Sequence, residues 1–130
     1  MKKCLLDSSF VIDLLNEIAA DKADGPALRW LSANKRSQCW ISPVTLAEVL
    51  EGAEDPEAVV NDLARFRWQG IDRNHARRVA LVQRSAPRRL GENDAWQAAL
   101  ADSMKATLVG SDKAFARAGI EYEDHRGRPT

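Results

Sequence analysis

The sequence predicts a three-layer α/β/α domain with a short, mainly parallel central sheet. Short apolar runs alternate with longer amphipathic segments, and several of the longer segments open at a Gly-Pro, Ser-Pro or Asp-Pro pair. Strands that alternate with helices favour a parallel sheet covered by helices on both faces. The 130 residues contain no repeat and no interior linker, so we expect one domain over residues 1–124. Residues 125–130 are polar and are expected to form a loose tail.

The short apolar runs are the predicted strands. Lys2–Leu6 is the first and Gln38–Ile41 the second, followed by a short strand near Gln69–Ile71. Thr107–Val109 is another, and Glu121–Glu123 is expected at the sheet edge. In parallel sheets, ligands bind beyond the carboxyl ends of the strands, so the residues that follow each strand are the candidates for chemistry.

Helices are predicted between these strands. The first, Ser8–Glu17, gathers Phe10 and Leu14 on one face and places Asp13 on the opposite face. The second begins at Pro26, because proline suits the first position of a helix. The other predicted helices are Val44–Gly52, a helix from Pro56 to about Arg67, Asn74–Ser85, Glu92–Ala106 and a short helix at Asp112–Ala118.

Composition excludes several classes of protein. A hydrophobic fraction of 45% and a charged fraction of 29% are ordinary for a globular protein, and no apolar run approaches the roughly 20 residues of a membrane span. The formal net charge of zero differs from the strongly basic character of proteins that grip duplex nucleic acid by charge. Cys4 and Cys39 lie in apolar runs and are predicted to be buried free thiols, which suggests the reducing cytoplasm. His75 and His125 have no partners at metal-binding spacing and are predicted at the surface.

Four acidic residues lie at the ends of strands or on the helices that follow them. Asp7 ends the first strand, and Asp112 stands just past the strand Thr107–Val109. Asp94 lies in the first turn of its helix, where the helix dipole favours a negative charge. Glu48 lies on the helix that follows the second strand. Carboxylates gathered in one pocket disfavour their charged forms, and a divalent cation relieves that repulsion. Mg²⁺ or Mn²⁺ prefers such oxygen ligands and could promote hydrolysis of a phosphodiester.

Each acid also has a structural explanation. Asp7 and Asp112 could cap the helices that follow them, and Asp94 could simply complement a helix dipole. Glu48 could be a solvated surface residue, and helical periodicity does not choose it over Glu51 or Glu54.

Four motifs, in order, make the chain similar to a known family. They are Leu5–Ile12 (LLDSSFVI), Ile41–Val49 (ISPVTLAEV), Asn93–Ala101 (NDAWQAALA) and Thr107–Phe115 (TLVGSDKAF). Along nearly its whole length the chain resembles the PIN domain, in particular the short toxins of VapBC toxin–antitoxin systems. The resemblance implies a metal-dependent endoribonuclease with an RNA substrate, often tRNA, an antitoxin that blocks the cleft, and a homodimer.

The resemblance also implies roles for individual residues. Asp7, Glu48, Asp94 and Asp112 would form the acidic quartet, with Asp7 and Asp94 the surest ligands of Mg²⁺ or Mn²⁺. Ser9 or Ser111 would help to hold a metal-bound water or a phosphate oxygen. The chain departs from the family pattern at Gly110, where a threonine is expected, and at Trp96 and Gln97, where aliphatic residues are more usual.

Arginines are dense between Arg65 and Arg89. Most are interpreted as a solvated helix face, whereas Arg88, Arg89 and Lys113 adjoin the acidic motifs and are the best candidates for substrate contact.

Two other functions compete with the nuclease. A non-catalytic PIN-like module would bind RNA or protein and use the acids as caps or for a structural ion, but such a retired site should have lost at least one acid. A receiver-like phosphotransfer domain would need paired acids after the first strand, and Asp7 has no acidic neighbour.

Overall fold

The computed structural model describes residues 1–127, which form a five-stranded sheet. The strands are β1 (Lys3–Leu6), β2 (Gln38–Ile41), β3 (Arg67–Trp68), β4 (Thr107–Gly110) and β5 (Tyr122–Asp124). Their order is β3-β2-β1-β4-β5, and every neighbouring pair is parallel. The carboxyl ends of β1, β2 and β4 therefore meet at one edge of the sheet.

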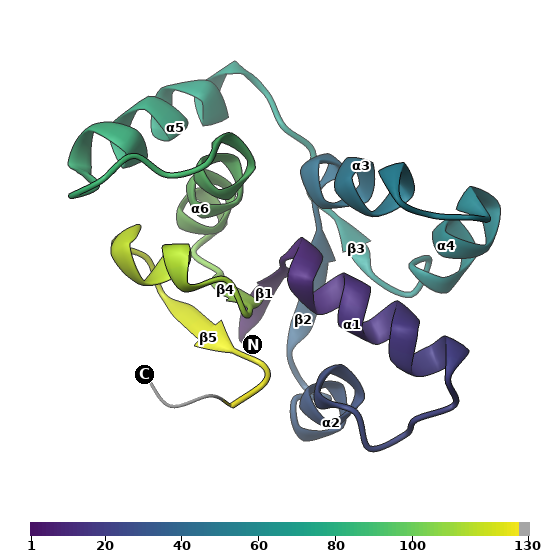
Figure 1. Cartoon of the computed structure of the whole chain (residues 1–130). Coiled ribbons are helices and arrows are strands. Elements are labelled where there is room, and N and C mark those ends of the chain that lie inside the picture. Colours follow the sequence, from purple (N-terminus) through teal and green to yellow (C-terminus); the bar gives the residue numbers. More distant parts are fainter. Residues whose placement is uncertain (128–130) are drawn as a thin grey trace.

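Helices cover both faces of this sheet, as Figure 1 shows. One face carries α1 (Ser8–Ala19), α2 (Pro26–Ala33), α3 (Pro43–Glu51) and α4 (Pro56–Asp62). The other face carries α6 (Glu92–Met104) and the 3₁₀ helix η1 (Lys113–Arg117), with α5 (Arg73–Ser85) packed on α6. The predicted three-layer α/β/α architecture is confirmed.

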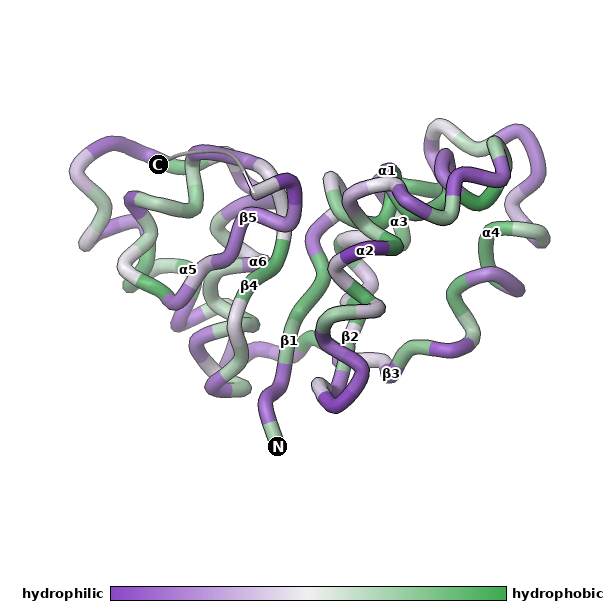
Figure 2. The backbone as a smooth tube through the Cα atoms, turned by 90° about the horizontal axis from the view of Figure 1, so that it is seen from below, coloured by the Kyte–Doolittle hydropathy of each residue, from purple (hydrophilic) through white to green (hydrophobic). Residues whose placement is uncertain are grey.

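Successive side chains of β1 point to opposite faces of the sheet, so the core has two halves. Cys4 and Leu6 pack toward α1 and α2, whereas Leu5 packs with Leu100 of α6 and Phe115 of η1. The central strands are correspondingly hydrophobic in Figure 2. Burying each such leucine stabilises the fold by roughly 1.5–3 kcal/mol. The strand that carries Asp7 at its end is thus anchored on both sides.

The segment after α4 differs from the prediction. The helix ends at Asp62 instead of near Arg67, and β3 is Arg67–Trp68 instead of Gln69–Ile71. Leu63 is fully buried, and the N–H of Phe66 donates to the Leu63 carbonyl, which closes a turn there. The chain can therefore pair with β2 two residues earlier than expected.

The expectation of surface histidines is wrong. His75 is 8% exposed, and its ring accepts a hydrogen bond from the N–H of Asp72, at the start of α5. His125 is 6% exposed and lies 2.7 Å from the carboxylate of Asp13 on α1. Arg126 donates to both oxygens of Asp13. The first two residues of the expected loose tail are thus part of the fold, and the rest of that tail from residue 128 lies outside the described residues.

Cys4 and Cys39 are free thiols, as predicted, with Cys4 buried and Cys39 half-buried. Burial raises the pKa of both thiols, that of Cys39 to about 11. Among residues 1–127, no helix is long and apolar enough to cross a membrane.

Candidate functional site

Asp7 follows β1 and caps α1. Its Oδ2 accepts hydrogen bonds from the N–H of Ser9 at 3.2 Å and from the Ser9 hydroxyl at 2.8 Å. The Ser9 hydroxyl oxygen in turn accepts from the N–H of Ser111, beyond β4, at 2.9 Å. The structural role considered for Asp7 is therefore real, and it fixes a buried carboxylate at the junction of two strand ends.

Asp112 and Asp94 face each other across this edge. Asp112 caps η1, with its Oδ1 accepting from the N–H of Ala114 at 2.9 Å. Asp94 is half-buried in the first turn of α6, where burial and the neighbouring Asp112 both raise its pKa.

The three other predicted acids all influence the pKa of Asp94. Its pKa is raised to about 7, first by burial, then by the neighbouring Asp112, and then by the charges of Asp7 and Glu48. Each of these influences disfavours a charged Asp94. The fold has therefore gathered negative charge from α3, α6 and the ends of β1 and β4.

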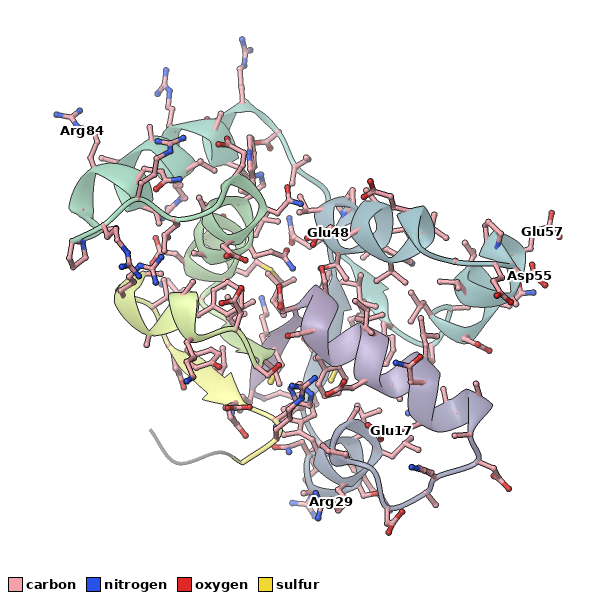
Figure 3. All side chains as sticks on the ribbon, viewed as in Figure 1. Glu17, Arg29, Glu48, Asp55, Glu57 and Arg84 are labelled. Atoms are coloured by element: carbon pink, nitrogen blue, oxygen red, sulfur yellow. The ribbon has the colours of Figure 1, made fainter. Side chains whose placement is uncertain are left out.

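The structure selects Glu48 among the glutamates that periodicity left open. Glu48 is half-buried and lies on the side of α3 toward α6, as Figure 3 shows. Glu51 and Glu54 are exposed. Only Glu48 of these three acts on the pKa of Asp94.

Gln97, one of the departures from the family pattern, is fully buried beneath the acids. Its Oε1 accepts from the Ser42 hydroxyl at 2.7 Å, and its Nε2 donates to the Thr45 hydroxyl and, at 3.5 Å, to Asp7. The Thr45 hydroxyl then donates to the carbonyl of Leu6 at 3.3 Å. This network ties α6 to α3 and to the end of β1. Sequence reasoning missed it, and the run Ser-Pro-x-Thr before Glu48 was its only signal.

The presence of glycine instead of threonine at position 110 also has a physical explanation. A Cβ atom there would lie 2.8 Å from the Asp7 Cβ and 2.8 Å from the Ser9 Oγ. Side chains essentially never approach so closely, so a threonine would displace Asp7. Close packing of β4 on Asp7 thus explains the departure.

The predicted substrate contacts take no part in the hydrogen bonds given above for this edge. Arg88 and Lys113 are exposed, and Arg89 is paired with Glu92 at 3.2 Å. Within residues 1–127, no three acidic, histidine or cysteine side chains meet closely enough to form a ready-made metal cage. The acids share one electrostatic environment but do not converge on one point.

Comparisons with known proteins agree with this fold. The family model described as PIN domain matches residues 4–121. A toxin–antitoxin complex from Klebsiella pneumoniae is 25% identical, with a TM-score of 0.77, over 94% of this chain and 97% of that one. VapBC2 of Rickettsia felis, bound to a DNA fragment from its promoter, is 20% identical, with a TM-score of 0.73, over 93% and 97%.

A third similar structure is VapC20 of Mycobacterium tuberculosis, described as a toxin that cleaves the sarcin–ricin loop. It is 23% identical, with a TM-score of 0.69, over 97% of this chain and 99% of that one. A search of curated proteins finds no match. With a family model spanning nearly all of its length and this sheet order, the chain belongs to the PIN domain family.

Proposed function

We propose that this PIN domain is a metal-dependent endoribonuclease whose Mg²⁺ or Mn²⁺ is held by Asp7, Glu48, Asp94 and Asp112. The observation that carries the proposal is the gathering of four acids at one edge of the sheet, where burial and the other three acids all act on Asp94. Such a cluster destabilises the protein unless a cation binds to it.

The donor set fits a hard divalent cation in chemistry and in charge. All four candidate ligands are carboxylates, and none of the interactions that shift the pKa of Asp94 comes from a lysine or arginine. The fit rests on donor type and charge and not on a preformed cage. When bound, one or two such ions supply a Lewis acid for phosphodiester hydrolysis.

The other roles in the reaction would be filled by individual residues of the chain. Asp7 is immobilised by Ser9 and Gln97, so it offers an oriented oxygen. Asp94, whose pKa is raised to about 7 by burial and by the neighbouring acids, would accept a proton from the attacking water. Ser9 and Ser111 lie beside Asp7 where β1 and β4 end, and one of them would help to hold a metal-bound water or a phosphate oxygen. Lys113, Arg88 and Arg89 would contact the RNA strand beside the cut.

The biological role follows from the structural neighbours. Two of the similar structures are toxin–antitoxin complexes, and VapC20 is described as cleaving an RNA loop. We therefore infer that this chain is the toxin of a VapBC-type pair, with a structured RNA as substrate and an antitoxin that covers the acidic edge. Assembly as a homodimer belongs to the same proposal.

Cleavage of RNA by the purified protein tests this function. Asp94→Asn and Asp7→Asn should lower Mn²⁺-supported cleavage by about 10²- to 10³-fold, the range for losing one preorganised electrostatic group. Asparagine can still accept the hydrogen bonds that cap α1, so the fold should survive the Asp7 substitution. Glu48→Gln should also lose activity, whereas Glu51→Gln, on the exposed side of the same helix, should not.

Two results would reject the nuclease. One is cleavage that persists in EDTA at the rate seen with Mn²⁺. The other is an Asp94→Asn protein that cuts as fast as the unaltered chain. A protein that binds RNA but never cuts it would instead be the non-catalytic PIN-like module.

A further inference from the structure

A cationic hollow lies at the opposite edge of the sheet from the acids. It has a volume of about 700 Å³ and is lined by residues at the amino ends of β1, β2 and β3. Lys2 precedes β1, and Arg67 opens β3. Because β1 spans four residues at about 3.3 Å each, roughly 13 Å of strand separates this edge from Asp7. The hollow is therefore a feature distinct from the acidic site.

The lining is strongly one-sided in charge. Among the residues that the structure describes, it contains five cations and no acid, in a chain whose formal net charge is zero. Lys2 is neutralised by Glu123 at 3.0 Å. The other four cations, on the connection into β2 and around β3, are exposed and form no ion pair within residues 1–127: Lys35, Arg36, Arg65 and Arg67. The start of β1 and this connection are both hydrophilic in Figure 2.

Two of these arginines are held in place by aromatic rings. The guanidinium of Arg65 lies 5.2 Å from the centre of the Phe66 ring, and that of Arg67 lies 5.8 Å from the centre of the Trp40 ring. Stacking restricts each side chain without neutralising its charge. Asn34, Ser37 and Gln38 add polar groups to the same wall.

We propose that this hollow binds the backbone phosphates of an RNA strand. The choice of RNA rests on the proposed function, whereas binding at the hollow requires no cleavage. A wall of unpaired cations and amide or hydroxyl groups matches nucleic-acid interfaces, which are more polar and more positively charged than protein interfaces. The cores of protein–protein interfaces are instead depleted of charge. Four cations spread over two segments fit successive phosphates of a strand better than a single anion.

Binding of a fluorescent single-stranded RNA in EDTA, measured by anisotropy at several salt concentrations, tests the proposal. The double variant Arg65→Gln/Arg67→Gln should bind roughly tenfold more weakly, and the slope of log affinity against log salt should fall by about 0.7 for each phosphate that is no longer neutralised. Lys35→Gln/Arg36→Gln, in a different segment, should behave alike and guards against a folding defect near β3. The matched control Arg29→Gln/Arg84→Gln removes two exposed arginines outside the hollow, both labelled in Figure 3, and should bind like the unaltered chain.

Three outcomes would overturn the site. They are unchanged affinity in both hollow variants, an equal loss in the control, and displacement of the RNA by polyglutamate as effectively as by unlabelled RNA of the same charge. Displacement by a mononucleotide at equal phosphate concentration would overturn the assignment to a strand. The hollow and the nuclease can fail separately, because hollow-dependent binding without cleavage in Mn²⁺ rejects only the nuclease, and cleavage with unaltered binding in the hollow variants rejects only the hollow.

Discussion

Two half-buried aspartates in this domain have pKa values that are shifted in opposite directions. Burial alone would raise the pKa of Asp13, but hydrogen bonds from Arg126 and His125 hold it below its ordinary value. For Asp94, burial and the neighbouring acids act in the same direction and raise the pKa to about 7. The chain supplies Asp13 with two cation-capable partners and surrounds Asp94 with acids.

This is the difference expected between a carboxylate with a structural role and one that binds a cation. Asp13 joins α1 to the segment after β5, and its charge is satisfied within the fold. Asp94 carries a repulsion that no residue of the cluster relieves, which is the situation expected when relief comes from a bound cation. The largest effect expected from this difference is the loss of cleavage in Asp94→Asn.

Asp13→Asn should destabilise the protein by about 2–3 kcal/mol, because it removes charge-assisted hydrogen bonds and leaves Arg126 and the buried His125 without their acceptor. Urea unfolding measures this loss. Asp102→Asn is the matched control, since its ion pair with Arg78 is exposed and contributes roughly 0–1 kcal/mol. Equal effects of the two substitutions would mean that Asp13 is an ordinary surface residue.

Asp94→Asn should instead increase the stability of the fold when metal has been removed with EDTA at pH 8. Removing a charge from the repulsive cluster should stabilise the fold by about 1 kcal/mol, a few degrees in Tm, after allowing for screening of this half-exposed group by water. Thermal unfolding followed by circular dichroism gives the value. A lower Tm in the variant would mean that the Asp94 charge is already balanced.

The stability gap between Asp94→Asn and the unaltered chain should depend on pH. A carboxyl group whose pKa is higher in the folded state than its ordinary 3.8 loses stability as pH rises from 3.8 through about 7. The gap should be near zero at pH 4 and fully open above pH 7, again in EDTA. Asp13 behaves in the reverse sense, because its lowered pKa contributes stability that disappears only as pH falls below about 3.8. A gap that stays constant from pH 4 to pH 8 would contradict the raised pKa.

The sequence was sufficient to predict the positions of the acids that directly follow a strand. Asp7 and Asp112 follow β1 and β4, and parallel strands necessarily bring their carboxyl ends to one edge. Glu48 could not be distinguished from Glu51, because both lie on a helix whose orientation depends on packing against α1 and α6. That information belongs to tertiary contacts and is absent from helical periodicity.

Other features depend on pairs distant in the chain. The contact between Asp13 and His125 spans 112 residues, and Gln97 reaches Ser42 and Thr45 across two helices. A single sequence carries no signal that joins such residues. The position of β3 was missed for a related reason, since a two-residue strand is set by pairing with β2 and not by its own hydrophobic pattern.

The central claim is that the four acids bind a divalent cation, and calorimetric titration of metal-free protein with Mn²⁺ tests it most directly. The unaltered chain and Glu51→Gln should bind Mn²⁺ alike, whereas Asp94→Asn should bind it tenfold or more weakly, at least the loss known for disturbing a metal site's supporting residues. Equal Mn²⁺ affinity in Asp94→Asn and the unaltered chain would contradict the account.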